Sequence, residues 1–114
     1  HFPDCSQEKR REWWAQRVSE LRDLGVTGVW NDMNEPAAWG QKMPDLIQFH
    51  YEGQGASHKE ARNIYGMQMT RATQEGLVKS KPQERPFVLT RAAFAGSQRY
   101  CAIWTGDNLS LIHI

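Results

Sequence analysis

This 114-residue sequence has little that would direct it to a membrane, a nucleic acid or a cofactor. It contains no apolar run near the roughly 18 residues that a membrane-spanning helix needs. Its formal net charge is only +1, so it has no strong electrostatic attraction for nucleic acids or anionic lipids. No G-x-G-x-x-G motif follows a strand-like segment, which argues against a dinucleotide cofactor. We therefore expect no membrane, nucleic acid or organic cofactor among its partners.

Cysteine is also scarce, and the two cysteines do not have the spacing of metal ligands. Cys5 and Cys101 lie near opposite ends of the sequence. We expect both to be reduced and to serve in packing, because an isolated thiol behaves as a small apolar side chain. No metal site is expected from the sequence.

The sequence begins without an initiator methionine and without a signal peptide. Its first residues, His1 to Asp4, are not a basic stretch followed by an apolar one. From this start and the short length we expect a piece of a longer protein. The missing signal peptide favours a cytoplasmic location.

The first helical pattern begins after Ser6, which suits an N-cap, and ends before Gly25, which suits a C-terminal stop. Apolar residues recur at i, i+4 and i+7 and predict one buried face. That face comprises Trp14, Val18 and Leu21. Arg22 falls on the opposite face, which we expect to be solvated.

A second helix is predicted after a long irregular loop over residues 37–55. The S-x-x-E capping box of Ser57 and Glu60 opens it, and Gly76 is expected to close it. Its apolar stripe comprises Ala61, Tyr65, Met69 and Ala72.

Three short β-branched and aromatic segments, residues 26–31, 86–90 and 101–104, are predicted to be strands. Helices and strands alternate, which predicts an α/β fold with a parallel sheet covered by helices. Polar residues gather after the carboxyl ends of the strands, as in a (β/α)₈ TIM barrel. A full barrel needs about 250 residues, so this chain would supply a partial barrel. A small open α/β sheet is the alternative.

Two strand ends look alike and suggest a sugar site. Trp30 is followed closely by Asp32, and Trp104 by Asp107. Carboxylates at the end of an apolar strand are costly to bury without partners or a ligand. Indole faces suit stacking on sugar rings, and two carboxylates are what glycosidic bond cleavage requires.

Around these aspartates the sequence resembles glycoside hydrolase family 31, the α-glucosidase family. The string from Gly28 to Pro36 resembles one active-site block of that family, and the string from Thr90 to Asn108 resembles a second. The resemblance implies a (β/α)₈ catalytic barrel, of which this chain would form roughly the middle strands and helices. Residues 1–108 would be that part of the barrel, whereas residues 109–114 depart from the family pattern.

The resemblance also implies a role for each residue of the two blocks. Asp32 matches the nucleophile of a retaining mechanism, and Asp107 matches the acid/base. Residues that match the walls of the sugar subsite are Trp30, Met33, Arg91 and Trp104. Asn34 and Glu35 are expected to form hydrogen bonds that hold these residues in place without contacting the sugar. Neither a metal nor an organic cofactor is implied.

The implied substrate is an α-linked, glucose-containing oligosaccharide, and the implied protein partner is the remaining part of the same barrel. The string Trp30-Asn31-Asp32-Met33 resembles glucose-acting members more than xylose-acting ones, which tend to carry Lys-Thr-Asp-Phe. Two other function classes stay open. One is a carbohydrate-binding module without turnover. The other is a divalent-metal hydrolase that uses Asp32, Glu35 and Asp107.

Overall fold

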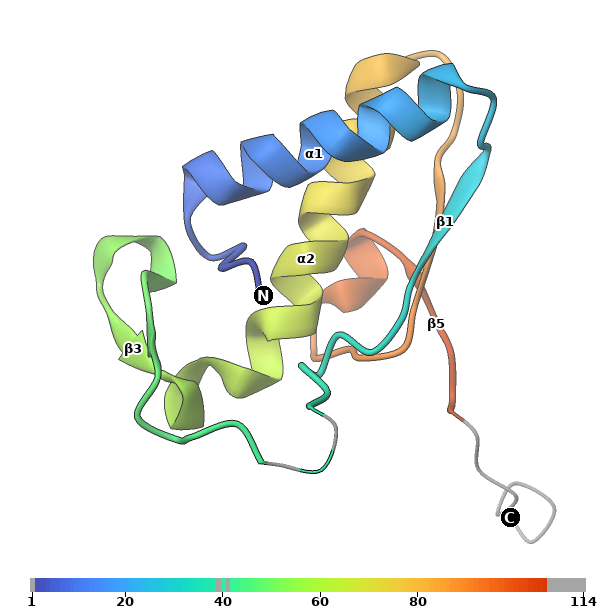
Figure 1. The fold of residues 1–114 in the computed structure, drawn as a ribbon. Helices are drawn as coiled ribbons and strands as arrows, with labels where there is room; N and C mark the ends of the chain where they lie inside the picture. Colours follow the sequence, from blue (N-terminus) through green and yellow to red (C-terminus); the bar gives the residue numbers. More distant parts are fainter. Residues whose placement is uncertain (1, 39, 41, 107–114) are drawn as a thin grey trace, which may run out of the picture.

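A parallel sheet of three short strands stands beside two long helices in the computed structural model, which describes residues 2–38, 40 and 42–106 (Figure 1). The strands are β1 (Gly28–Asn31), β4 (Phe87–Thr90) and β5 (Ala102–Ile103), in the order β1-β4-β5. Val29 pairs with Val88, and Leu89 pairs with Ala102, both in parallel registers. The predicted α/β fold with a parallel sheet is therefore confirmed.

Helix α1 (Glu8–Asp23) begins and ends close to the predicted positions, but its N-cap is not Ser6. Gln7 is the N-cap residue, and it makes no side-chain capping bond. The Ser6 hydroxyl accepts a hydrogen bond from the backbone N–H of Tyr51 instead, at 2.7 Å. Ser6 is thus used to attach the segment before α1 to a distant loop.

The predicted faces of α1 are wrong at its last turn. Leu21 is 47% exposed, whereas Arg22 is 2% exposed. The Arg22 guanidinium donates to the carbonyl of Thr27 and to the carboxylate of Glu84, both at 2.8 Å. A buried guanidinium is tolerated because these two acceptors replace water, and it ties the end of α1 to the segments before β1 and β4.

Helix α2 (His58–Ser80) has the predicted capping box: the Ser57 backbone N–H donates to Glu60 at 2.8 Å. The four residues of its predicted apolar stripe are all buried. The helix does not close at Gly76 but continues for another turn. Gly76 is buried against Ala15 of α1, so its missing side chain serves the helix crossing rather than a helix end.

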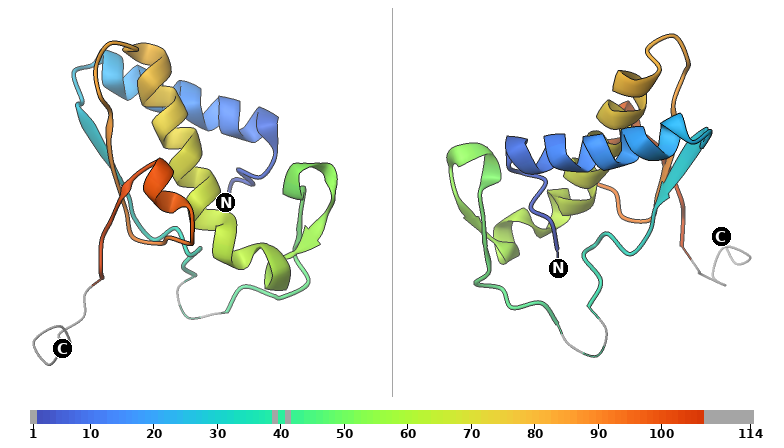
Figure 2. Two further views of the ribbon diagram at one scale, coloured as in Figure 1. Left: turned by 180° about the vertical axis from the view of Figure 1, so that it is seen from behind. Right: turned by 45° about the horizontal axis from the view of Figure 1, so that its top comes forward.

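A hairpin that sequence reasoning missed occupies part of the expected loop. Strands β2 (Gln48–Phe49) and β3 (Ala56–Ser57) pair antiparallel around the 3₁₀ turn η1 (Tyr51–Gly53). The hairpin lies at the N-terminal end of α2, away from the three-stranded sheet (Figure 2). Two-residue strands are too short to have a visible alternation, which is why the pattern gave no signal.

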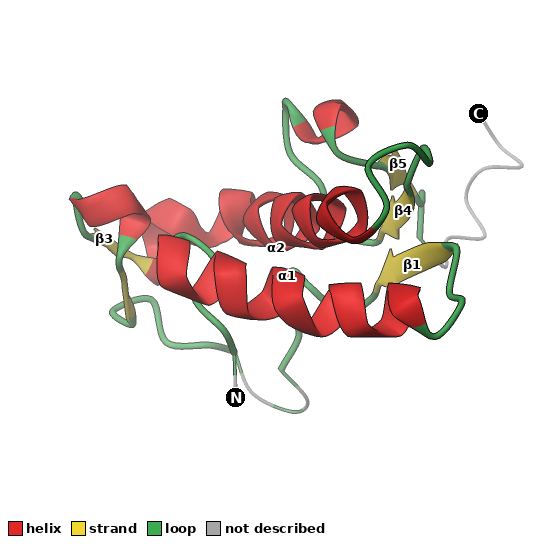
Figure 3. Ribbon diagram, turned by 90° about the horizontal axis from the view of Figure 1, so that it is seen from above, coloured by secondary structure: helices red, strands yellow, loops and turns green. Residues whose placement is uncertain are grey.

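Two small apolar clusters form the core of the described part of the chain. One joins the hairpin to the N-terminal half of α2 and includes Cys5, Phe49, Tyr65 and Met69. The other joins both helices to the sheet through Val18, Leu77 and Val88. Both helices therefore lie against one face of the sheet, and neither of them covers its other face (Figure 3). Among the described residues, no helix is long and apolar enough to cross a membrane.

Replacing Gly76 by alanine should destabilise the fold although alanine is the better helix former. A Cβ atom there would lie 2.9 Å from the Ala15 Cα atom and closer still to the Ala15 carbonyl oxygen. The helix-propensity gain of about 1 kcal/mol is outweighed by overpacking, which costs about 1–3 kcal/mol. Urea unfolding of a full-length protein that contains this sequence measures the effect. The exposed substitution Lys79→Ala in the same helix is the control, and a more stable Gly76→Ala protein would contradict the packing described.

His58 should make the fold sensitive to acid. It is 2% exposed, its ring lies 5.8 Å from that of Phe49, and burial lowers its pKa from 6.5, with nearby Arg62 acting in the same direction. The folded state thus favours neutral imidazole, so this stability is complete above about pH 6.5 and declines as the pH falls towards the folded-state pKa.

Urea midpoints measured between about pH 8 and about pH 5.5 should fall less in His58→Phe than in the unchanged protein. His50→Gln, at an exposed histidine, is the control and should keep the full decline. Equal declines in the His58→Phe variant and the unchanged protein would show that another group is responsible.

Candidate active site

The chain leaves β1 through a sharp turn that buries one polar side chain and leaves another exposed. Met33 has a φ of 57°, in the left-handed region, so the backbone reverses directly after Asp32. The Met33 N–H donates to Asp32 Oδ1 at 2.9 Å. As a result Asn34 is buried, at 1% exposure, while the Asp32 side chain remains 42% exposed.

Arg91, at the end of the neighbouring strand, brings three other site residues together. Its backbone N–H donates to the carbonyl of Asn31 at 3.0 Å, so β4 continues its pairing with β1. Its guanidinium lies 3.6 Å from Asp32 Oδ1 and 3.2 Å from Glu35 Oε1, and donates to Met33 Sδ at 3.0 Å. Half-exposed ion pairs contribute little to stability, so the significance of this arrangement is the geometry it imposes on Asp32.

Trp30 and Trp104 form an apolar wall beside these charges. Their ring centroids are 4.9 Å apart and their planes meet at 83°, an edge-to-face pair. Trp30 is 48% exposed on the sheet face that the helices do not cover. The Trp104 N–H donates to the carbonyl of Thr90 at 2.9 Å, which holds the chain after β5 at the same edge of the sheet.

The second expected carboxylate, Asp107, lies outside the described residues, as do Asn108 and the tail 109–114. The described chain ends at Gly106, two residues beyond Trp104. The separation of the Asp32 and Asp107 carboxyl groups, expected at about 5–7 Å for a retaining enzyme, therefore stays a prediction.

Beneath the strand ends lies a set of buried hydroxyl groups that sequence reasoning missed. Thr73 accepts hydrogen bonds from Asn31 Nδ2 at 2.9 Å and from Trp14 Nε1 at 2.8 Å. Trp14 thus packs inside the fold, as predicted, but also through a polar bond. Thr90 is likewise fully buried, and its hydroxyl accepts a hydrogen bond from Asn34 Nδ2 at 2.9 Å.

The available signal was a second periodicity in α2. Gly66, Thr70 and Thr73 stand at i, i+4 and i+7, on one helix face. All three are buried although none is a large apolar residue. A row of small and hydroxyl-bearing residues indicates a face that meets polar groups at close range.

Two adjoining hollows open beside the Arg91–Glu35 pair. One of 440 Å³ is lined by the loop after β1 and by His58 and Arg62 of α2. The other, of 390 Å³, extends along α2 to Gly66. Both are lined by groups of both charge signs, which suits a polar ligand such as a sugar rather than an apolar one.

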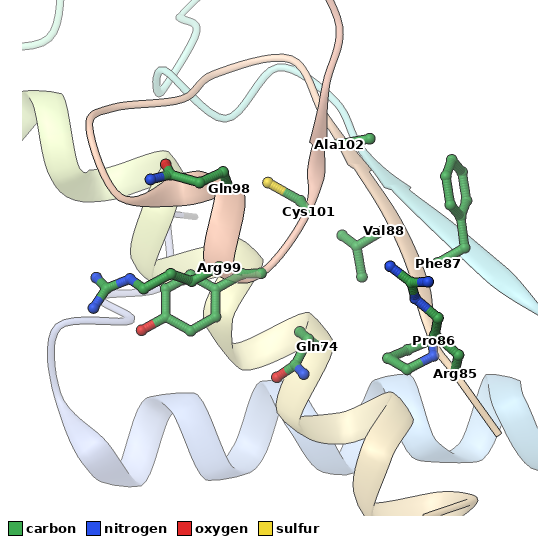
Figure 4. Close-up of a pocket in the computed structure, with 10 residues that line it drawn as sticks. Gln74, Arg85, Pro86, Phe87, Val88, Gln98, Arg99, Cys101 and Ala102 are labelled. Atoms are coloured by element: carbon green, nitrogen blue, oxygen red, sulfur yellow. The ribbon is translucent and has the colours of Figure 1, made fainter. Parts of the chain in front are cut away.

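Another hollow, of 560 Å³, lies on the helix side of the sheet between α2, β4 and the chain before β5 (Figure 4). Its lining includes Gln74, Val88 and Cys101 but no carboxylate. Burial raises the pKa of the Cys101 thiol and raises that of Cys5 to about 12, so neither is a thiolate nucleophile near neutral pH. Both cysteines are free, as predicted.

Within residues 2–38, 40 and 42–106, no three His, Cys, Asp or Glu side chains gather closely enough to hold a metal ion. In that part of the chain Asp32 and Glu35 have Arg91 as their common partner. A cation in that position occupies the place that a divalent metal would need.

Comparison with known proteins relates the chain to one family. Residues 1–113 match the family model described as the glycosyl hydrolases family 31 TIM-barrel domain. The chain is 46% identical over 111 residues to alpha-glucosidase 2 of Bacillus thermoamyloliquefaciens. That alignment covers 96% of this chain and 14% of the relative.

Solved structures give the same relation. An ER glucosidase II heterodimeric complex is similar with a TM-score of 0.78 and 41% identity, over 92% of this chain and 12% of that one. A family 31 dextranase from Flavobacterium johnsoniae, complexed with glucose, is similar with a TM-score of 0.79 and 34% identity, over 92% and 13%. The chain thus spans only a small part, 12–14%, of the proteins it matches.

Proposed function

This chain belongs to glycosyl hydrolase family 31, and from that premise we propose that it carries the catalytic aspartates of a retaining glycosidase acting on α-linked glucose. One observation supports the proposal above the others. At the ends of adjacent parallel strands, Asp32 meets the guanidinium of Arg91 beside the indole pair of Trp30 and Trp104. A carboxylate, a cation and two aromatic rings at one sheet edge are what binding and cleaving a sugar requires.

Asp32 is the proposed nucleophile. Its Oδ1 atom accepts the Met33 N–H at 2.9 Å and lies 3.6 Å from the Arg91 guanidinium. These two contacts fix the rotation of the carboxyl group, so we assign the attack on the anomeric carbon to the other oxygen, Oδ2. Arg91 then has two functions, since it holds Asp32 in place and its guanidinium donates to sugar hydroxyls.

Asp107 is the proposed acid/base. In the first step Asp32 Oδ2 forms a bond to the anomeric carbon while Asp107 donates its proton to the departing glycosidic oxygen. In the second step Asp107 takes a proton from water, and the water oxygen displaces Asp32 from the same carbon. Two inversions give net retention, and the second step regenerates both carboxyl groups.

The proposed substrate is an α-linked, glucose-containing oligosaccharide. The relatives named above are an α-glucosidase, a glucosidase II and a dextranase complexed with glucose. The exposed face of Trp30 supports this assignment, because an indole face matches the C–H surface of a pyranose ring. The adjoining hollow with Glu35 and Arg62 offers polar groups for hydroxyls of the same sugar or the next one.

The proposed setting of this site is a (β/α)₈ barrel completed by further strands. Among the described residues β1 and β5 each pair on one side only. Large apolar side chains are exposed on the sheet, with Trp30 at 48%, Phe87 at 58% and Ile103 at 50%. Unpaired edges and exposed apolar faces are liabilities that neighbouring strands and helices remove.

The open alternative is a carbohydrate-binding module without turnover. It would retain the indole pair and Arg91 but would have no use for a nucleophile held by two contacts. The experiments below separate the two possibilities, because a binding module would keep its function when Asp32 and Asp107 are neutralised.

Neutralising each aspartate in a full-length protein that contains this sequence should produce different defects. Asp107→Asn should lower turnover of a natural disaccharide by about 10²–10⁴-fold, while the first step of an activated aryl α-glucoside is spared, since a good leaving group needs no proton. Added azide, which needs no base, should then attack the glycosyl-enzyme and give the α-glycosyl azide. Asp32→Asn should abolish turnover of both substrates and give no α-azide. Product anomers are measured by NMR.

Asp45→Asn, at a loop carboxylate that pairs with Lys42, is the matched control and should behave as the unchanged protein. An α-azide from Asp32→Asn together with an inert Asp107→Asn would reverse the two assignments. Full activity in both variants would show that neither aspartate is catalytic. Sugar binding without turnover in the unchanged protein would leave the binding module as the better description.

The isolated 114-residue chain should aggregate or lack a cooperative thermal transition, because its sheet edges and apolar face would be open to solvent. Scanning calorimetry and sedimentation at low concentration test this expectation. A sharp, reversible transition of a monomer would instead indicate a module that needs no further strands.

A further inference from the structure

We propose that Thr90 is a positioning residue that sets the Asp32–Arg91 geometry, an inference that rests on the proposed function of Asp32. Thr90 is the last residue of β4, is fully buried, and directly precedes Arg91. It does not reach the candidate substrate site. Its effect would pass through the loops that follow the three strands.

The Thr90 side chain joins two of these loops. Its hydroxyl accepts a hydrogen bond from Asn34 Nδ2 at 2.9 Å and donates to the carbonyl of Ala92 at 2.9 Å. Asn34 lies two residues after Asp32, and Ala92 directly follows Arg91. The other end of the Asn34 amide, Oδ1, accepts the backbone N–H of Ala92 at 3.0 Å. Three bonds thus close a ring between the loop that carries Asp32 and the loop that carries Arg91.

Each group in this ring has only one orientation that satisfies it. The Ala92 N–H is a donor, so the atom of Asn34 that faces it must be the amide oxygen, and the NH₂ group must face Thr90. The single proton of Thr90 then goes to the Ala92 carbonyl. Thr70, 3.2 Å from Thr90, has a closer acceptor in the Gly66 carbonyl at 2.7 Å. A network with one consistent set of donors is directional, and it fixes the loops more narrowly than apolar contact would.

The Thr90 backbone attaches the third loop. Its carbonyl accepts the N–H of Trp104 at 2.9 Å, at the point where the chain leaves β5 towards Gly106. Thr90 is therefore bonded to the segments after β1, β4 and β5. A shift at this residue would be transmitted to Asp32, Arg91 and Trp104 together.

Helix α2 packs closely against two of these loops, those after β1 and β4. A Cβ atom on Gly66 would lie 2.8 Å from both the Ala92 Cβ and the Asn34 carbonyl oxygen. The helix backbone thus presses on the same two residues that Thr90 joins. Since Asp32 is held by the Arg91 guanidinium at 3.6 Å, a small separation of the loops would release the nucleophile.

The test compares Thr90→Val, which keeps shape but removes the hydroxyl, with Thr90→Ser, which keeps the hydroxyl. Ser19→Ala is the matched control, since it removes a buried hydroxyl that donates to Gly76 at the helix crossing. All are made in a full-length protein that contains this sequence. Readouts are the melting temperature, kcat and KM on an aryl α-glucoside, and the rate at which a fluorinated α-glucosyl fluoride labels the tryptic peptide that contains Asp32.

Thr90→Val should lower kcat and the labelling rate by about 10–100-fold, with a smaller change in KM, at a melting temperature no lower than that of Ser19→Ala. Thr90→Ser should recover most of both rates. If Thr90→Val does not fold, Asn34→Asp gives the same test, because a carboxylate accepts from Ala92 but cannot donate to Thr90.

Rates in Thr90→Val that match those of Ser19→Ala, or a Thr90→Ser protein as slow as Thr90→Val, would overturn the inference while the proposed function stands. A protein without substitutions that neither turns over the substrate nor is labelled at Asp32 would overturn the proposed function, and this inference with it.

Discussion

The arrangement at the strand ends depends on how closely α2 approaches the sheet. At Gly66 the helix backbone touches the loops after β1 and β4, and any side chain there would collide with Ala92 and the carbonyl of Asn34. Further along the same face, Thr70 and Thr73 carry hydroxyl groups instead of apolar side chains. These hydroxyls form hydrogen bonds with residues at the ends of the strands. This interface is held by oriented hydrogen bonds, whereas apolar packing tolerates sliding. Such an interface places a few polar groups precisely at the sheet edge.

Regular periodicity made most of the fold predictable, and two of the failures, at Ser6 and Arg22, occurred where a polar group had an unforeseen partner. The capping box at Ser57 and the apolar stripe of α2 are local patterns, and both were confirmed. Arg22 was misassigned because its acceptors, Thr27 and Glu84, are brought to it by the tertiary fold. Ser6 was misassigned for the same reason, since its partner Tyr51 belongs to a distant hairpin. Local propensity is overridden in such cases by contacts that spacing along the chain does not reveal.

The sequence indicated that Asp32, Arg91 and the two indoles belong to one site, and they do lie close together, whereas their catalytic roles stay predictions. The buried groups that support them were not foreseen. Parallel neighbours bring their carboxyl ends to one edge, so the meeting of Asp32 with Arg91 follows from strand order alone once β1 and β4 pair. The buried hydroxyl of Thr90 gave no such signal, because a threonine at the end of a strand is ordinary in sequence. Its role depends on which loop side chain turns inward, and that is decided by the backbone reversal at Met33.

Met33 also connects the stability of this turn with the placement of the Asp32 carboxylate. A residue with a Cβ atom in the left-handed region is strained by about 1–2 kcal/mol, and glycine would adopt the same φ of 57° freely. Glycine, however, would remove the sulfur that accepts a hydrogen bond from Arg91 at 3.0 Å. Selection for a more robust turn and selection for a well-aimed carboxylate therefore act in opposite directions on one side chain. The exchange that would relieve strain in this turn is therefore also one that would remove a contact to Arg91, the residue that positions Asp32.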